Sequence, residues 1–190
     1  MSQLDEVVSS DLEDLILVNE QDESIGTMPK RECHEDDGRL HRAFSVFIFN
    51  HKGEVLLQRR SEQKMLWPMF WSNACCSHPR EGETSEFAAH RRLQQELGIE
   101  AELTFLYKFQ YHARYRDIGS EHELCWVWVG EAEAEDVQPN TNEIAEWRFF
   151  SREELDRELD TNPDAYTPWM KMEWQRIFDE HRKQLPHSVQ

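Results

Sequence analysis

The sequence predicts an α/β or α+β fold in which a mixed β-sheet is sandwiched between helices. Two observations lead to this expectation: β-rich runs recur along the chain, and three segments carry helix start or stop signals. A length of 190 residues with 38% hydrophobic residues suits one domain with a full core. Without a repeat or a long linker, we expect a single domain over residues 15–190, preceded by a flexible acidic arm over residues 1–14.

The expected strands are short runs rich in β-branched and aromatic residues. They cover residues 15–18, 43–49, 55–58, 103–111, 123–130 and 144–150. Turns are expected at residues 19–22 and 50–53, where Asn, Asp and Gly gather. The order of these runs predicts strands on both sides of a central helical segment.

Three helices are expected from local signals. Residues 84–97 can begin on a Thr84 or Ser85 cap and end at Gly98, a residue type common at helix C-termini. Residues 151–154 (SREE) have the pattern of a capping box that opens a short helix. Pro168 stands at the first position of a last helix, where the missing N–H costs nothing.

The composition limits the classes of function. A formal net charge of −17 disfavours nucleic-acid binding, and it also repels a diphosphate unless basic residues or a metal ion gather locally. No apolar run approaches the roughly 20 residues that span a bilayer, so no membrane partner is expected. The chain start lacks a signal-peptide pattern, and the adjacent Cys75 and Cys76 are poorly placed for a disulfide. We therefore expect a reduced, cytoplasmic protein.

Arg92 and Glu96 lie four residues apart and share one face of the expected central helix. They could form an ordinary ion pair, or Arg92 could hold an anion while Glu96 holds its Mg²⁺. The surrounding run resembles a Nudix box, the motif that binds metal-diphosphates. The matching residues are Glu83, Arg91, Leu93, Glu96, Gly98 and Ile99. Ser77 replaces the opening glycine, and Arg92 and Gln95 replace two acids, so the resemblance implies diphosphate binding without efficient hydrolysis.

Three histidines and two glutamates form a candidate metal site. His34, His41 and His78 stand near apolar strands or turns, while Glu121 and Glu123 point to the same face of a strand. Such a donor set suits Mn²⁺ or Zn²⁺ better than Mg²⁺. Spacing alone leaves the alternative open that these are solvated or hydrogen-bonded histidines.

The motifs together resemble the type 1 isopentenyl-diphosphate isomerases, in the family's order from about residue 15 to about residue 178. The most specific segment is residues 73–79 (NACCSHP). The other matching segments are residues 40–45 (LHRAFS), 67–71 (WPMFW), 121–123 (EHE) and 167–170 (TPWM). This resemblance implies a Nudix-like fold and the conversion of isopentenyl diphosphate to dimethylallyl diphosphate in isoprenoid biosynthesis.

The resemblance also implies the role of each matching residue. Cys76 and Glu123 are the expected proton-transfer residues, with Tyr111 beside Glu123 and Trp169 over the hydrocarbon. The five expected ligands of a tightly bound Mn²⁺, Zn²⁺ or Mg²⁺ are His34, His41, His78, Glu121 and Glu123. Glu96 is expected to bind a second Mg²⁺ that arrives with the substrate diphosphate. The expected diphosphate-binding residues are Lys30, Arg60, Lys64 and Arg92.

Purely structural roles are the alternatives for single residues: Cys76 could be a buried structural thiol, and Trp169 could be a core side chain. A Nudix hydrolase of a nucleoside or related diphosphate is the main alternative function, and a non-catalytic binding module is the second. The sequence leaves open whether the protein is a monomer or a homodimer. It also leaves open the direction of proton flow between Cys76 and Glu123.

Overall fold

The computed structural model describes residues 8–10 and 13–190. Its strands are β1 (Asp14–Val18), β2 (Ser24–Pro29), β3 (His41–Phe49), β4 (Val55–Arg60), β5 (Trp71–Asn73), β6 (Cys75–Ser77), β7 (Thr104–Tyr115), β8 (Gly119–Glu131) and β9 (Ile144–Phe150). The α-helices are α1 (Lys30–His34), α2 (Ser85–Leu97), α3 (Arg152–Thr161) and α4 (Pro168–Glu180). Short 3₁₀ turns cover Ala134–Asp136, Pro163–Ala165 and Arg182–Gln184.

The strands form one mixed sheet around β3. This central strand pairs in parallel with β8, from His41 opposite Glu123 to Phe49 opposite Glu131, and antiparallel with the short β6. β7 and β8 form a long antiparallel hairpin, while β4 pairs with β5 and β9. The expected mixed sheet is therefore confirmed.

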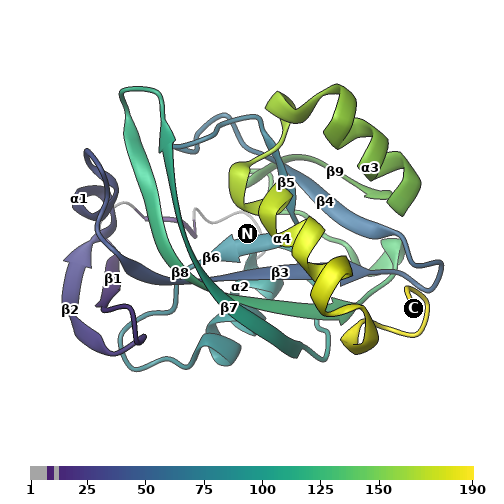
Figure 1. Ribbon diagram of the computed structural model, residues 1–190, viewed down its shortest axis with the longest axis horizontal. Helices are drawn as coiled ribbons and strands as arrows, with labels where there is room; N and C mark the ends of the chain where they lie inside the picture. Colours follow the sequence, from purple (N-terminus) through teal and green to yellow (C-terminus); the bar gives the residue numbers. More distant parts are fainter. Residues whose placement is uncertain (1–7, 11–12) are drawn as a thin grey trace.

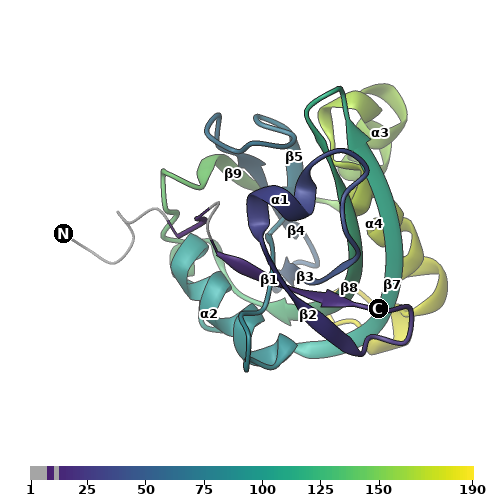
Figure 2. The ribbon, with the colours of Figure 1, turned by 90° about the vertical axis from the view of Figure 1, so that its left-hand side faces the viewer.

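Helices cover both faces of the sheet. In Figure 2, α2 and α4 lie on opposite sides, and Figure 1 shows α4 crossing in front of β7 and β8. Because neighbouring residues of a strand face opposite sides, β3 supplies both cores. Phe47 and Phe49 pack towards α4, and Phe44, Val46 and Ile48 pack towards α2.

Local capping signals correctly predicted both ends of α2 and the starts of α3 and α4. The Thr84 hydroxyl accepts a hydrogen bond from the Phe87 N–H at 3.2 Å, and Gly98 ends α2 with a φ of 69°. The Ser151 hydroxyl caps α3 by accepting from the Glu154 N–H, and Pro168 opens α4.

Four short elements escaped sequence-based prediction: β2, α1, β5 and β6. β2 is an edge strand whose sequence, SIGTMP, carries Gly and Pro, which are depleted in strands. β5 and β6 have three residues each and become strands through pairing with β4 and β3. The hairpin strands β7 and β8 are also longer than expected.

The arm expected over residues 1–14 falls largely outside the described residues, so its flexibility stays a prediction. Within the described part, Ser9 contacts the protein interior and Asp14 already belongs to β1. Among the helices of the described ranges, none has the length and apolar character that crossing a membrane requires.

Candidate active site

A pocket opens beside β6, β8 and the start of α4. It is lined by Ser9, Lys30, His34, Arg60, Gln63, Lys64, Met65, Leu66, Cys76, Ser77, His78, Tyr111, Glu121, Glu123 and Trp169. The lining contains every site residue expected from the sequence except His41, Glu96 and Arg92. Of these three, His41 belongs to the histidine cluster, and Glu96 and Arg92 are buried, with Arg92 bound to the pocket residue Ser9.

Four chain segments bring the histidine cluster together. His34 ends α1, His41 begins β3, His78 follows β6, and Glu121 and Glu123 lie on one face of β8. All five side chains are buried, and one ligand atom of each lies within 4.8 Å of the others. The parallel pairing of His41 with Glu123 aligns two of these residues directly.

Backbone carbonyls orient two of the imidazoles. Nδ1 of His34 lies 2.6 Å from the Lys30 oxygen, and Nδ1 of His41 lies 2.7 Å from the Arg39 oxygen. A carbonyl can only accept, so each Nδ1 carries a hydrogen and each Nε2 faces into the cluster. Nε2 of His34 reaches Glu121 at 2.7 Å.

The inward-facing atoms lie within a few ångström of one another. Nε2 of His41 and Nε2 of His78 are 3.2 Å apart, and His78 Nε2 lies 3.1 Å from Glu123 Oε1. Burial alone would raise the pKa of Glu123, but contacts with His41 and Tyr111 lower it, so the carboxylate is ionised. Nitrogen and carboxylate donors converging in this way fit a divalent metal.

Adjacent positions in β6 send the two cysteines to opposite faces. Cys75 is fully buried in the core under α2, while Cys76 packs against the other core and lines the pocket. Burial raises the pKa of Cys76 to about 11, although the Arg60 guanidinium opposes this shift. Cys76 is therefore a thiol at neutral pH.

Tyr111 holds the second expected proton-transfer residue. Its hydroxyl donates to Glu123 Oε2 at 2.6 Å, and burial beside Glu123 raises the pKa of Tyr111, so the phenol keeps its proton. Register places Tyr111 opposite Glu123 in the β7–β8 hairpin.

Aromatic rings form one wall of the pocket. Trp169 meets the edge of Trp67 with ring centroids 5.2 Å apart, and it lies 6.1 Å from the Tyr111 ring. The Arg60 guanidinium lies over Trp169 at 5.4 Å and donates to the carbonyl oxygens of Leu66 and Trp67. The wall thus presents π surface beside a fixed positive charge.

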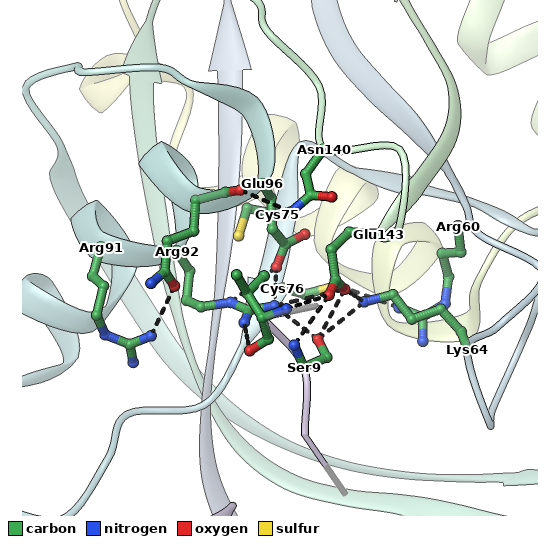
Figure 3. A network of polar contacts seen from close by, with 12 residues as sticks. Ser9, Arg60, Lys64, Cys75, Cys76, Arg91, Arg92, Glu96, Asn140 and Glu143 are labelled. Carbon is green, nitrogen blue, oxygen red and sulfur yellow. Dashed lines mark hydrogen bonds and ion pairs between the residues drawn. The ribbon is translucent and has the colours of Figure 1, made fainter. Parts of the chain in front are cut away.

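Buried charges around Lys64 and Arg92 form the network of Figure 3. Arg92 Nε donates to Glu96 Oε1 at 3.0 Å, so the ion pair considered from the sequence is present. Glu143 makes an ion pair with Lys64 and lies 3.9 Å from Arg92. These cations hold the pKa of Glu143 at about 2, against the opposing effect of burial.

Sequence reasoning missed Glu143 and Ser9. The Ser9 N–H and hydroxyl donate to the Glu143 carboxylate at 3.0 and 2.9 Å, and Arg92 Nη2 donates to the Ser9 oxygen at 2.9 Å. The two residues are 134 positions apart. With 38 acidic residues in the chain, no local signal distinguishes Glu143 from a surface carboxylate.

The fold and site define the class of this protein. Residues 39–170, more than half the chain, match the NUDIX domain family. A crystal structure from Deinococcus radiodurans superposes with a TM-score of 0.69 at 24% identity, covering 86% of this chain and 98% of that one. The MutT protein of Methanosarcina mazei superposes with a TM-score of 0.58 at 22% identity, covering 76% and 96%. The expected Nudix fold is confirmed.

Curated relatives narrow the class. Isopentenyl-diphosphate Delta-isomerase 1 of Photorhabdus laumondii is 42% identical over 92% of this chain and 99% of its own length. The isomerase of Halorhodospira halophila is 38% identical over 84% of this chain and 92% of its own. The Nocardia farcinica isomerase is 42% identical over 81% and 88%. This chain belongs to the isopentenyl-diphosphate Delta-isomerase family.

Proposed function

We propose that this protein converts isopentenyl diphosphate to dimethylallyl diphosphate, a 1,3-allylic rearrangement in isoprenoid biosynthesis. The observation that carries the proposal is one pocket in which Cys76, Glu123, a buried metal-ligand cluster and three basic side chains meet. The relatives that share 37–42% identity over most of the chain bear the same activity in their names.

The chemistry adds one proton to an alkene and removes another on the far side of the former double bond. Alkenes are weak bases, so the acid must be well placed and water excluded. In our proposal Cys76 and Glu123 exchange protons with the substrate, and the Tyr111 hydroxyl keeps Glu123 oriented. Trp169 stabilises the tertiary carbocation-like intermediate, a contact worth about 2 kcal/mol or more when desolvated.

His34, His41, His78, Glu121 and Glu123 would hold a divalent cation, for which we propose Mn²⁺, Zn²⁺ or Mg²⁺. Such a cation would neutralise the two carboxylates and set the acidity of Glu123. The chain itself supplies the orientation, through the backbone carbonyls of Lys30 and Arg39. Cytoplasmic location and a monomeric or homodimeric state remain proposals of the same kind.

The substrate diphosphate would bind at Lys30, Arg60, Lys64 and Arg92, with Glu96 as ligand of its Mg²⁺. Burial lowers the pKa of Lys30, and the nearby cations Lys64 and Arg92 lower it further. An anion placed among these side chains would add to the charge compensation that Glu143 and Glu96 already give Lys64 and Arg92. In our proposal, local positive charge of this kind lets a chain with a net charge of −17 attract a diphosphate.

One experiment separates the isomerase from its alternatives. Purified protein with isopentenyl diphosphate and Mg²⁺ in D₂O is followed by proton NMR together with phosphate release. We expect dimethylallyl signals with deuterium uptake and no phosphate. Phosphate release without an allylic product would instead support a Nudix hydrolase, the alternative that the acid-poor Nudix box disfavours. The absence of both signals from metal-loaded protein would support a binding module.

A further inference from the structure

The hydroxyl of Ser72 in β5 contacts two residues of the proposed active site at once. Ser72 is fully buried and does not line the pocket. Its Oγ lies 3.1 Å from Nε1 of Trp169 and 3.7 Å from Sγ of Cys76. A single buried oxygen therefore joins a ring of the aromatic wall to the thiol.

Asn73 fixes the direction of the Ser72 hydrogen. The Asn73 amide nitrogen donates to the Val46 oxygen at 3.1 Å and to the Cys75 oxygen at 2.9 Å. Its amide oxygen therefore faces Ser72 and accepts the Ser72 O–H at 3.0 Å. The Ser72 oxygen is left with its lone pairs for the surrounding donors.

Two residues at the start of α4 donate hydrogen bonds to the Ser72 oxygen. The indole N–H of Trp169 can only donate, and the Thr167 hydroxyl also donates to Ser72 at 3.1 Å. The Thr167 N–H binds the Trp71 oxygen at 2.9 Å, so β5 holds this helix start through backbone and side chains together. The hydrogen bond to Ser72 thus restricts the position of the Trp169 indole ring.

We propose that Ser72 is a positioning residue, which holds the indole of Trp169 by a hydrogen bond and limits the position of the Cys76 thiol by packing against it, in the mutual arrangement that the isomerisation needs. The inference rests on the proposed function, because Cys76 and Trp169 take their roles from it. The substrate hydrocarbon must lie against both groups, so a shift of either one changes the approach of the reacting carbon. Ser72 acts through them and touches no substrate atom.

The chain offers a matched control for removing this hydroxyl. Ser85 is also buried, and its hydroxyl accepts from the indole N–H of Trp128 at 3.3 Å. Trp128 belongs to the core under α2 and does not line the pocket. Ser85→Ala therefore leaves a buried indole N–H without its partner, as Ser72→Ala does, but away from the chemistry.

The test compares Ser72→Ala, Ser72→Thr and Ser85→Ala in metal-loaded full-length protein. A misplacement of about 1 Å can cost about 100-fold, so we expect Ser72→Ala to lower kcat about 10- to 100-fold while KM changes less than about 3-fold. Ser72→Thr keeps the hydroxyl and should restore most of kcat. Ser85→Ala should leave kcat near the wild-type value.

Alkylation of Cys76 provides a readout that does not depend on catalysis. Cys33, Cys75 and Cys125 are buried, so limited iodoacetamide labelling followed by mass spectrometry reports on Cys76. We expect Ser72→Ala, but not Ser85→Ala, to change the labelling rate. This readout distinguishes failure of the inference from failure of the proposed function, since an enzyme inactive as wild type would still show the labelling difference.

A double-mutant cycle covers the case in which Ser72→Ala alone is poorly folded. If Ser72 works through Trp169, adding Ser72→Ala to Trp169→Phe should reduce kcat much less than it does in the wild type. Unchanged kcat and labelling in Ser72→Ala, or full additivity with Trp169→Phe, would overturn the inference.

Discussion

At the scale of single residues, the adjacent cysteines show how neighbouring positions in one strand can have different surroundings. Cys75 and Cys76 share a three-residue strand, and alternation along that strand sends Cys75 into the core and Cys76 into the pocket. The two side chains are chemically identical, so the difference in their surroundings comes from the face of the sheet alone.

Substitution of each cysteine should separate these roles. Cys76→Ala should lower the isomerisation rate by about 10²- to 10⁴-fold, because it removes a proton-transfer group. Cys75→Ala should keep the rate near wild type and lower the free energy of unfolding by about 1 kcal/mol, since it leaves a small cavity. Kinetics and urea unfolding of both variants measure the two effects. Equal loss of rate in both would contradict the assignment of Cys76.

Glu173 is a buried acid that the proposed chemistry does not use. It is fully buried beside Cys125, whose Sγ lies 3.6 Å from its Oε1. Burial is the main cause that raises the pKa of Glu173 to about 8, and Glu123 adds to the shift. The carboxyl is therefore largely protonated at neutral pH.

This shift predicts a pH-dependent stability. Because the folded-state pKa of Glu173 is above its unfolded value of 4.5, the folded protein binds the proton more tightly. The free energy of unfolding should fall as pH rises between these values, by up to about 1.4 kcal/mol per unit. Glu173→Gln should remove that loss, so it should be more stable than wild type at pH 8 relative to pH 5. Urea unfolding at several pH values measures this, and parallel pH profiles for the two proteins would contradict it.

At the scale of elements, α2 supplies both core residues and residues of the charged network. Leu93 and Leu97 face the core, whereas Arg92 and Glu96 join the charged network behind the pocket. The Thr84 cap and the left-handed Gly98 define the two ends. Any change that shifts the end of α2 therefore also moves Glu96.

Gly98→Ala tests that C-terminal stop. A side chain at a φ of 69° costs about 1–2 kcal/mol, and the added Cβ would lie 2.8 Å from Gln138 Cβ. Gly82→Ala is the matched control, because Gly82 has a φ of 83° but no atom within 4 Å of the added Cβ. Urea unfolding should show a larger loss of stability for Gly98→Ala. An equal loss of stability in both variants would contradict the prediction that the contact with Gln138 adds to the cost of Gly98→Ala.

At the scale of the whole molecule, the metal-ligand cluster joins segments that are far apart in the chain. Its five residues come from α1, β3, the segment after β6, and β8. The carboxylate oxygens and the inward-facing imidazole nitrogens can all donate electron pairs to a divalent cation. Binding a cation should therefore stabilise the fold as well as prepare the site.

Metal removal should lower the melting temperature. A ligand at 100 times its Kd stabilises the folded state by about 2.7 kcal/mol, so chelation should shift Tm downward and excess Mn²⁺ or Zn²⁺ should restore it. His41→Ala should largely abolish the response. The exposed His51, which pairs with Glu133, provides the control in His51→Ala. If chelator does not change the Tm of the wild-type protein, that result would contradict a metal at this cluster.

The candidate site was predictable to the extent that its residues lie in recognisable motifs. His34, His41, His78, Glu121 and Glu123 were expected as one set, and the structure brings all five together. Ser9, Glu143 and Ser72 were not expected. Serine and glutamate are common residues, and their roles here depend on partners that only folding brings near.

By itself the sequence determined both ends of α2, the starts of α3 and α4, the longer strands and the segments in which the candidate site residues lie. These features depend on caps, glycines and motifs that act over a few neighbouring residues. Only the tertiary structure decided that β5 and β6 are strands and that Glu143 pairs with Lys64 and Ser9. Those outcomes depend on sheet pairing and on charges meeting in a buried space, which residues distant in sequence create together.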